Sequence, residues 1–518
     1  MFLILDALAS GRGKRLSSLD VIGAGPRLIA GILEEFGFEY ELMRVEDFLK
    51  RGKPFQGVSL VSAMSMDEAA VARAARLLRG IKVIGGPITS DRNAVGRLGF
   101  DLGVWGEGEL ALSLLLEKGA FEGLSDLRGI PNLVFPSGAT SELRYLSKEE
   151  FSSFKPSVNA IKFYRTIPNY KCSRVYVEVV RGCSNFNRPK LIAREEVCGK
   201  CSSCHSGSNR LVCPQGIPPG CGYCSIPSLY GPPKSREEKS ILEEIEGLVK
   251  LGARRIVLSG ADFLEYGRDL SSTPLTNPIY PKPNLDAIES LLSEVRGLSE
   301  KYGFFFEVEN AKPCLIDEEV ASTLGRYLRG TPIHIGIETG DEMHSRMIGR
   351  PCGPRESLRA IKLLKKYGLR PYAYFIHSLP GQGRKTAIKT ADLMRKVFHE
   401  GAEKITVYKF RPLPGTAFQD FRVRVDSRSR RIVDLAIDLN RRRKEEIVGE
   451  VIEAITAPKI GRLQFAYPVK GGPTIRLRGS EDLGVGEIVS VRIVRAISDR
   501  LVEGVVSSKN PREMGLQW

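Results

Sequence analysis

The sequence predicts an α/β protein with three parts: a doubly wound domain, a central partial (β/α)6 barrel and a C-terminal small β-barrel. Three observations support this class. Short apolar strands alternate with amphipathic helices through residues 1–150, six strand and helix units follow within residues 173–420, and residues 448–518 contain short strands with glycine at the bends. Because short crossovers between parallel strands are right-handed, six such units are expected to curl into part of a barrel.

The composition fits a chain of several domains without a membrane segment. Of its 518 residues, 42% are hydrophobic and 27% are charged. No apolar run approaches the roughly 20 residues of a membrane span. We therefore expect a cytoplasmic protein with no membrane partner. A formal net charge of +16 favours a polyanionic partner such as RNA.

The first domain is predicted over residues 1–150. Its expected strands lie at residues 2–8, 40–45, 57–63, 81–87 and 102–105, and its expected helices at residues 26–36, 66–78 and from 106 onward. This alternation is typical of a doubly wound, Rossmann-like sheet. The domain contains neither cysteine nor histidine. Residues 151–172, rich in Ser, Pro and Lys, are predicted to form a linker.

Seven of the ten cysteines lie between residues 177 and 236. Cys183 follows a predicted strand over residues 175–180, and Cys221 and Cys224 close the stretch as CGYC. The insert between them, residues 184–220, carries a CxxCxxC motif and one further cysteine: Cys198, Cys201, Cys204 and Cys213. We expect a three-cysteine site and a separate four-cysteine site. In the alternative grouping, Cys213 joins Cys221 and Cys224.

The number of thiolates predicts what each site does. Three thiolates leave one iron of a [4Fe-4S] cluster open to an outside ligand, whereas four thiolates close a cluster or a tetrahedral zinc site. The three-cysteine site is therefore predicted to be the reactive one. The insert is predicted to hold a second [4Fe-4S] cluster or Zn, with His205 as an alternative ligand. Disulfides are not expected in a reducing compartment, and the isolated Cys172, Cys314 and Cys352 are predicted to be structural thiols.

The central domain is predicted over residues 173–420. After the cysteine stretch, Ser240 and Glu243 form a capping-box pattern that predicts the start of a helix. Further strands are expected at residues 253–260, 304–309, 333–340, 370–381 and 404–412. Cys183, Asp262 and Glu338 fall at or just after strand ends. Since these ends form one rim of such a barrel, we expect the catalytic groups there.

These motifs resemble the radical S-adenosylmethionine superfamily. Its signature is C-x3-C-x2-C, whereas here 37 residues separate Cys183 from Cys221. The resemblance implies that Cys183, Cys221 and Cys224 bind the cluster and are catalytic. It further implies an electron donor such as ferredoxin or flavodoxin, and cleavage of S-adenosylmethionine to methionine and a 5′-deoxyadenosyl radical.

The same resemblance implies roles for residues around the cluster. Tyr223 would face the adenine of S-adenosylmethionine. Ser259 and Asp262 would face its methionine end, and Glu338 its ribose or the substrate. Turns and helix caps are the alternative roles for residues at such strand ends.

The flanking segments also resemble known modules. Residues 1–150 are similar to the cobalamin-binding domain found before many of these enzymes, through IGGP at residues 84–87 and GEGE at residues 106–109. The Asp-x-His-x-x-Gly motif that supplies a cobalt ligand is absent, which leaves cobalamin binding open. FRPLPGTA at residues 410–417 resembles the R-P-G-T-x-A segment of radical methylthiotransferases.

The C-terminal part favours an RNA partner. After a connecting helix at residues 421–447, residues 448–518 resemble a TRAM domain, the RNA-binding barrel that ends tRNA methylthiotransferases. From Phe421 onward the chain has 19 Lys and Arg against 13 Asp and Glu, a net of +6. Phe465 and Tyr467 are predicted to be exposed on this barrel, where they would stack on bases.

Three functions follow as hypotheses. The leading one is a radical enzyme that modifies RNA, by methylthiolation or methylation of tRNA. Against methylthiolation, residues 1–150 lack the three cysteines that those enzymes keep in this domain. The second is cobalamin-assisted methylation of a protein or small molecule. The third is a zinc-bearing RNA-binding protein without turnover.

Overall fold

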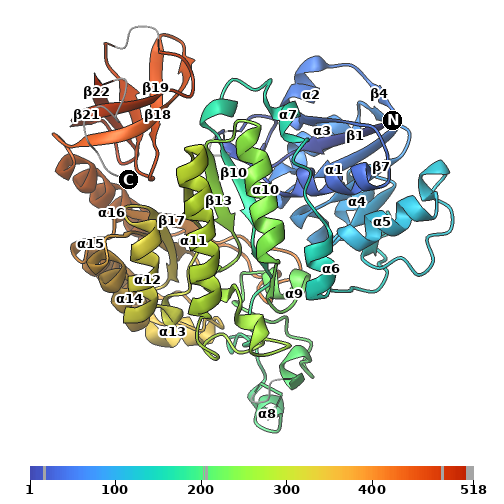
Figure 1. The fold of residues 1–518 in the computed structure, drawn as a ribbon. Coiled ribbons are helices and arrows are strands. Elements are labelled where there is room, and N and C mark those ends of the chain that lie inside the picture. The colour runs from blue at the N-terminus through green and yellow to red at the C-terminus, as the bar shows by residue number, and fades with distance from the viewer. Residues whose placement is uncertain (16–18, 202, 205–207, 480–482, 509–518) are drawn as a thin grey trace.

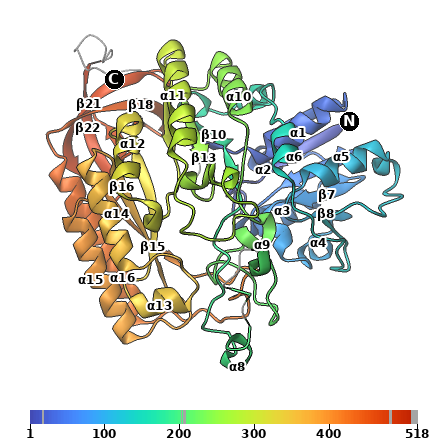
Figure 2. The ribbon, with the colours of Figure 1, turned by 60° about the horizontal axis from the view of Figure 1, so that its bottom comes forward.

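The computed structural model describes residues 1–15, 19–201, 203–204, 208–479 and 483–508. It is a mixed α/β structure in three parts, which Figure 1 shows in blue for the N-terminal domain, teal to orange for the central domain, and orange-red for a C-terminal barrel. The cysteine-rich insert with α8 (Glu195–Cys198) projects from the central domain in both ribbon views (Figures 1 and 2).

A six-stranded sheet forms the N-terminal domain, in the order β3-β1-β5-β7-β8-β9. Its strands are β1 (Phe2–Asp6), β3 (Tyr40–Arg44), β5 (Val58–Ser62), β7 (Lys82–Gly85), β8 (Leu102–Val104) and β9 (Leu133–Val134). They are parallel except for β9, which pairs antiparallel with β8. The helices are α1 (Gly25–Glu35), α2 (Val45–Arg51), α3 (Glu68–Ala75), α4 (Ala94–Arg97) and α5 (Glu109–Glu117). Every residue of β1 is buried, as expected for a parallel strand covered on both faces.

Six parallel strands form the partial barrel of the central domain. They are β10 (Arg174–Glu178), β13 (Arg255–Ser259), β14 (Phe305–Val308), β15 (Pro332–Glu338), β16 (Arg370–His377) and β17 (Lys404–Lys409). A bridge between Asn310 and His334 joins the two halves of this sheet. The outer helices are α10 (Glu238–Lys250), α11 (Leu285–Tyr302), α12 (Glu318–Leu328), α14 (Pro354–Lys366), α15 (Arg384–His399) and α16 (Ser427–Glu446).

An unpredicted strand from the N-terminal part extends this sheet. β2 (Val21–Ile22) pairs in parallel with β10, and Val21 lies opposite Arg174. Asp20, just before β2, forms an ion pair with Arg174, with 3.0 Å between Asp20 Oδ2 and Arg174 Nε. Two residues are too few for a periodic signal, so the sequence pattern gave no sign of this strand.

Shorter elements connect these parts. The helices are α6 (Lys148–Ser153), α7 (Ile161–Tyr164), α9 (Ile226–Tyr230) and α13 (Glu342–Met347), and two-residue strands pair as β4 (Phe55–Gln56) with β6 (Leu78–Arg79) and β11 (Val180–Arg181) with β12 (Lys234–Ser235). The 3-10 helices are η1 (Ser65–Asp67), η2 (Pro87–Ser90), η3 (Ala120–Glu122), η4 (Tyr170–Cys172), η5 (Ser208–Leu211), η6 (Phe263–Glu265), η7 (Arg268–Leu270) and η8 (Pro313–Leu315).

The predicted capping box at Ser240 was wrong. Helix α10 begins two residues earlier, at Glu238. The Ser240 hydroxyl instead accepts a hydrogen bond from the Arg236 guanidinium at 3.0 Å. The Ser240 hydroxyl, which the capping-box pattern assigned to the start of the helix, therefore bonds a buried arginine.

The C-terminal part is a closed five-stranded barrel in the order β18-β19-β20-β22-β21. Its strands are β18 (Val451–Ile460), β19 (Leu463–Pro468), β20 (Thr474–Leu477), β21 (Ile488–Ala496) and β22 (Leu501–Ser508). The prediction that Phe465 and Tyr467 are exposed was wrong. Both are half-buried in an apolar cluster with Cys172 and Phe305, because this side of β19 packs against the central domain.

Buried ion pairs fix the N-terminal domain against the central domain. Arg181 pairs with Glu109 at 2.5 Å and with Glu107 at 3.1 Å, and its side chain is only 10% exposed. Lys234 lies 2.8 Å from the same Glu107. Since removing one member of a buried ion pair leaves an uncompensated charge, these contacts hold the two domains in one arrangement. Within the described residues, no helix combines the length and apolar character that crossing a membrane requires.

Candidate active site

The three cysteines of the predicted reactive site come from two loops. Cys183 follows β11, and its amide donates to the Gly231 carbonyl at 3.1 Å. Gly182 has φ of +93°, and a Cβ there would lie 2.4 Å from the Pro232 oxygen, so only glycine fits before Cys183. Cys221 and Cys224 close a tight turn in which the Cys224 amide donates to the Cys221 carbonyl at 2.9 Å.

These thiols lie near one another at the barrel rim. Burial raises the pKa of Cys183 to about 11, with a smaller contribution from Cys221. Burial raises the pKa of Cys224 to about 12, and both other cysteines add to the shift. The Asn185 side-chain amide donates to Cys221 Sγ at 3.3 Å and to the Gly349 carbonyl at 3.0 Å. Asn185 therefore holds the two cysteine loops together.

The four insert cysteines gather separately. The pKa of Cys204 is raised by burial, and Cys213, Cys201 and Cys198 add to the shift against the opposing charge of Arg188. Gln215 donates to Cys198 Sγ at 3.0 Å. His205 lies outside the described residues. Among the described residues, no set of three or more His, Cys, Asp or Glu side chains has the arrangement of a single-ion site.

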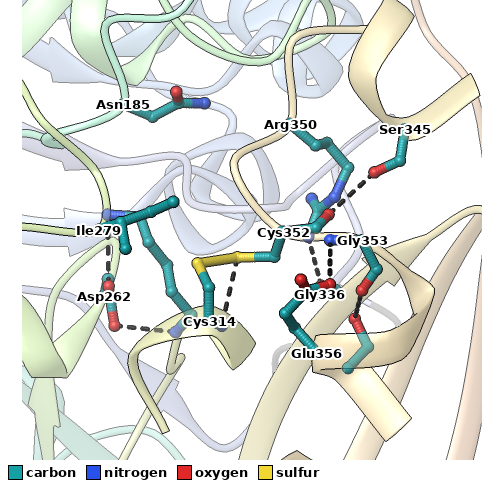
Figure 3. Close-up of a disulfide and its surroundings, with 12 residues drawn as sticks. Asn185, Asp262, Ile279, Cys314, Gly336, Ser345, Arg350, Cys352, Gly353 and Glu356 are labelled. Carbon is teal, nitrogen blue, oxygen red and sulfur yellow. Dashed lines mark hydrogen bonds and ion pairs between the residues drawn. A yellow bond between two sulfur atoms is a disulfide. The ribbon is translucent and has the colours of Figure 1, made fainter. Parts of the chain in front are cut away.

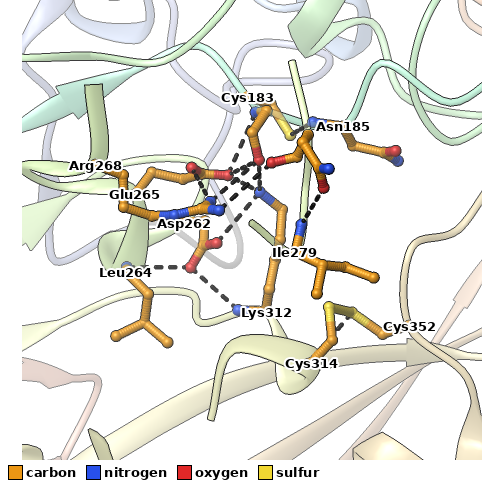
Figure 4. Close-up of polar contacts among 12 residues, drawn as sticks. Cys183, Asn185, Asp262, Leu264, Glu265, Arg268, Ile279, Lys312, Cys314 and Cys352 are labelled. Carbon is orange, nitrogen blue, oxygen red and sulfur yellow. Dashed lines mark hydrogen bonds and ion pairs between the residues drawn. A yellow bond between two sulfur atoms is a disulfide. The ribbon is translucent and has the colours of Figure 1, made fainter. Parts of the chain in front are cut away.

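Asp262 lies in a buried polar network next to Cys183 (Figure 4). Its Oδ1 accepts from the amides of Leu264 at 3.2 Å and Lys312 at 3.1 Å, so it caps the 3-10 helix that follows β13. Lys312 Nζ lies 3.3 Å from Asp262 Oδ2 and also pairs with Glu265. Burial lowers the pKa of Lys312, but Cys183 and Glu265 raise it more, so the ammonium is retained beside the cysteine.

Glu338 stands at the end of β15 in a strained conformation. Its φ is +67°, in the left-handed region that non-glycine residues rarely adopt. Arg350 NH1 lies 3.3 Å from Glu338 Oε1 and donates to the Tyr223 hydroxyl at 2.7 Å. Burial raises the pKa of Glu338, and Arg350 opposes that shift. Arg350 thus links two residues assigned to S-adenosylmethionine or substrate by the resemblance.

The prediction of separate thiols at Cys314 and Cys352 was wrong. The two form a disulfide with Cα atoms 5.3 Å apart (Figure 3). Cys314 lies on η8 after β14, and Cys352 follows the loop that carries Arg350. Loops that follow neighbouring strands meet at this rim, which brings together two cysteines 38 residues apart.

A cavity of about 810 Å³ lies between the N-terminal and central domains. Apolar residues of β5, β7, α1 and α5 and the glycine turns at the carboxyl ends of the N-terminal strands line one end. The other end is lined by residues of the partial barrel: Tyr176, Glu178, Ser259, Glu309 and Tyr408. Ser259 therefore faces this cavity, whereas Asp262 is only 1% exposed.

The residues present fit the implied groups. Three thiols held on two loops match a cluster in which three irons each take one cysteine. Arg350 Nε is buried without a hydrogen-bond partner among the described residues, which leaves a donor for a bound molecule. The apolar walls and glycine turns of the cavity suit a large flat cofactor.

Sequence reasoning missed several residues of this site. Asn185 stands two residues after Cys183, and Arg350 belongs to a basic loop. Glu309 and Lys312 follow β14 just as Asp262 follows β13. The rule that found Asp262, a polar residue directly after a strand, would also have found Glu309.

Comparisons with known proteins identify the family of the central domain. Residues 212–394 match the Radical SAM superfamily. An uncharacterized protein of Methanopyrus kandleri is 43% identical over 526 residues, covering 97% of this chain and 95% of the relative. One from Methanocaldococcus jannaschii is 38% identical over 510 residues, covering 97% of each. A tRNA-2-methylthio-N(6)-dimethylallyladenosine synthase of Sulfurihydrogenibium is 21% identical over 287 residues, 54% of this chain and 61% of that protein.

Solved structures share the fold. The radical S-adenosylmethionine methyltransferase TsrM from Kitasatospora setae, with cobalamin and a [4Fe-4S] cluster bound, has a TM-score of 0.54 and 16% identity, covering 80% of this chain and 76% of that one. The cobalamin-dependent enzyme OxsB has a TM-score of 0.54 and 13% identity, covering 76% and 51%. The central part of the chain is a radical S-adenosylmethionine domain, and the chain belongs to one family with the proteins of Methanopyrus kandleri and Methanocaldococcus jannaschii.

Proposed function

We propose that this protein is a radical S-adenosylmethionine enzyme that methylates RNA and holds cobalamin between its N-terminal and central domains. The observation that carries the proposal is the cavity of about 810 Å³, because it joins the carboxyl edge of the N-terminal sheet to the barrel. Ligands of open α/β sheets bind at that edge. The cavity thus brings a cofactor on the N-terminal domain to the rim with the three cysteines.

Different residues at this rim would bind the cluster and S-adenosylmethionine. Cys183, Cys221 and Cys224 would hold a [4Fe-4S] cluster, and Asn185 keeps their loops together through Cys221. Arg350 orients Tyr223 and Glu338 toward S-adenosylmethionine. When bound, the cluster and S-adenosylmethionine supply a 5′-deoxyadenosyl radical, and cobalamin supplies a carrier for a methyl group.

The C-terminal barrel supports an RNA substrate. Its likeness in sequence to a TRAM domain suits phosphate contacts. The net of +6 from residue 421 onward suits them too, with +4 in residues 421–447 and +2 in residues 448–518. With Phe465 and Tyr467 packed against the central domain, base stacking on those two rings is not part of the proposal. Helix α16 and the barrel together therefore contribute charge, and the bases are recognised elsewhere.

Methylthiolation is the second candidate, favoured by the similarity to the methylthio-adenosine synthase of Sulfurihydrogenibium. It requires a sulfur source. The four gathered insert cysteines would hold a second [4Fe-4S] cluster, yet four ligands would close that cluster. A closed cluster or a zinc ion in the insert suits electron transfer or structure better than sulfur donation.

Metal content and product mass test the proposal. Anaerobically reconstituted protein should bind cobalamin, seen in its visible absorption, and should form 5′-deoxyadenosine from S-adenosylmethionine with a reduced ferredoxin or flavodoxin. RNA recovered from the reaction should carry a methyl group. About eight irons per chain would add a second cluster, whereas about four irons with one zinc would make the insert structural. Protein that excludes cobalamin and yields methylthiolated RNA would overturn the proposal in favour of the second candidate.

A further inference from the structure

We propose that the barrel end of the cavity is a nucleotide-binding site, in which Tyr408 stacks on a base, Lys404 and Arg500 hold its phosphate, and Glu309 with Tyr176 contacts the base edge. This inference rests on the proposed function and names the part of the RNA that enters: one unstacked nucleotide. It also gives the C-terminal barrel, which supplies Arg500, a place in the substrate site.

The aromatic part of the site is a row of stacked and tilted rings. Tyr408 is 56% exposed and lines the cavity. It stacks on Tyr374 with ring centroids 5.8 Å apart and an interplanar angle of 11°. Tyr374 contacts His334, with centroids 5.4 Å apart. Tyr408 is thus held in orientation from one side, and among the described residues no other ring stacks on it, which leaves its second face for a planar ring.

One cation acts on the same tyrosine, and a second cation lies near the first. Arg500, at the hairpin between β21 and β22, acts on both Tyr408 and Lys404. Burial lowers the pKa of Lys404, and the positive charges of Arg500 and Arg174 lower it further. Asp499 pairs with Arg500 at 3.3 Å, but the arginine side chain remains 83% exposed. Asp499 also acts on Lys404, but its effect is smaller than those of the two arginines. A further anion would relieve the remaining repulsion between Lys404 and Arg500, and phosphate next to a stacked base supplies one.

The carboxyl group of Glu309 in this site is suited to hydrogen bonds with the edge of a base. Glu309 and Tyr176 both line the cavity. Burial raises the pKa of Glu309 to about 7, while Arg174 and the Tyr176 hydroxyl oppose the shift. Near neutrality the group therefore both donates and accepts hydrogen bonds, as the polar edges of nucleobases require.

The combination is more specific than any of its parts. A hydrophobic ligand would need none of these charges, and a simple anion would need no exposed ring. A phosphate next to an aromatic face and a hydrogen-bonding floor match a nucleotide taken out of its stack. The tethering of Arg500 to the C-terminal barrel explains how that barrel takes part without presenting Phe465 and Tyr467 to solvent.

Mononucleotide binding tests the site directly. The full-length protein is saturated with S-adenosylmethionine so that its adenosine site is occupied. Adenosine, guanosine, cytidine and uridine 5′-monophosphates are then titrated by calorimetry, with ribose 5-phosphate as the probe without a base and free tryptophan as the ring without a phosphate.

Two variants separate stacking from charge. Tyr408→Ala should weaken the binding of nucleotides by about 5- to 100-fold, and leave ribose 5-phosphate unaffected, because stacking is lost. Arg500→Ala should weaken nucleotides and ribose 5-phosphate alike and reduce the dependence of affinity on salt. Arg478→Ala is the matched control. It removes an exposed arginine of the same barrel that lies far from Arg500 along β20. Thr474, at the start of β20, donates its amide to the Arg500 carbonyl, whereas Arg478, just after the end of β20, donates its amide to the Gly504 carbonyl.

The outcomes distinguish this inference from the proposed function. Nucleotides that fail to bind, bind no better than tryptophan, or bind Tyr408→Ala with unchanged affinity overturn the inference, provided the variant unfolds at the wild-type temperature. RNA methylation retained at full kcat/KM in Tyr408→Ala overturns it while leaving the proposed function intact. Tyr408-dependent nucleotide binding by a protein that does not modify RNA supports the inference and refutes the proposed function.

Discussion

Gly222, between Cys221 and Tyr223, shows at the residue scale why the CGYC turn needs its glycine. A Cβ at Gly222 would lie 2.4 Å from the ring of Phe418, which is fully buried. Gly222 also donates its amide to the Ile348 carbonyl at 2.8 Å, so the turn cannot move away freely. We expect Gly222→Ala to reduce the iron bound per chain after reconstitution, because the turn must shift and displace Cys221.

A second substitution tests that cause. Phe418→Leu in the same chain should restore part of the iron content by making room for the added methyl group. Gly297→Ala is the control, since a Cβ there meets nothing within 4 Å on helix α11. It should leave the iron content unchanged and raise the free energy of unfolding by about 0.5–1 kcal/mol. Equal iron content in Gly222→Ala and wild type would contradict the packing argument.

Glu309 gives a prediction of pH dependence. Its pKa is about 7 in the folded protein against an ordinary 4.5, so the folded state binds the proton more tightly than the unfolded chain. The contribution of Glu309 to the free energy of unfolding therefore falls as the pH rises from about 4.5 to about 7. The pKa of Glu309 is set by Arg174 and Tyr176 on β10 and by Glu307 on β14. Tyr374 on β16 also interacts with Glu309, and the His334 amide on β15 donates to the Glu309 carbonyl.

Urea unfolding at about pH 5 and about pH 8 measures the effect. In Glu309→Gln the stability should fall less between these two values than in the wild type. Glu300→Gln, at a position 65% exposed on α11, should follow the wild type. A Glu309→Gln chain with the wild-type pH slope would mean that this carboxyl does not carry the raised pKa.

The sequence predicted the site residues that belong to recognisable motifs and missed those set by tertiary contact. Cys183, Cys221 and Cys224 stand in a spacing pattern, and Glu338 follows a strand. Lys312 lies beside Cys183 only because β14 is the second neighbour of β10 in the sheet. No spacing along the chain encodes that proximity.

At the scale of elements, the disulfide joins two rim loops that the strand pattern treats as separate. It closes a loop of 38 residues between η8 and the loop after α13. Constraining a loop of this size in the unfolded chain stabilises the folded state by about 2–4 kcal/mol. We expect Cys352→Ala to lose this amount in apo-protein unfolded by urea without reductant.

Reductant separates the disulfide from the packing of the side chain. With reductant present, the wild type should lose the same stability, and the difference between the two proteins should shrink to the effect of removing one buried thiol. Cys172→Ala, which also removes a buried cysteine, should differ from the wild type by the same amount in both buffers. A difference for Cys352→Ala that reductant leaves unchanged would rule out the disulfide as its source.

Strands and helices with strong periodicity were predictable, and short or capped elements were not. The six barrel strands lie where alternating or apolar runs predicted them, and the five C-terminal strands lie within residues 448–518, where short strands were expected. β2 has two residues and exists only because β10 offers it an edge. Phe465 and Tyr467 alternate as surface residues should, but the surface they face belongs to the central domain.

At the scale of the whole molecule, the cavity depends on how two domains meet, and the sequence holds little sign of that. The GEGE segment at residues 106–109 is easily recognised in the sequence, but nothing in that segment indicates that its glutamates pair with Arg181. Glu107 and Glu109 are 0% and 3% exposed at their side chains, so both carboxylates depend on cations supplied by the central domain. The charge of the rim is thus shared between parts of the chain about 70 residues apart.

Removing Arg181 should therefore destabilise the whole molecule. Arg181→Met keeps the length of the side chain but leaves Glu109 and Glu178 without their partner, while Lys234 still pairs with Glu107. Uncompensated buried charge costs about 3–5 kcal/mol, which should appear as a lower free energy of unfolding in urea. Adding Glu109→Gln should recover part of that loss, because one of the two unpaired carboxylates is then replaced by a neutral amide. Arg128→Met, at a side chain 94% exposed, should change stability little. If Arg181→Met unfolds like Arg128→Met, the ion pairs do not hold the domains together, and the cavity must be maintained by its apolar walls alone.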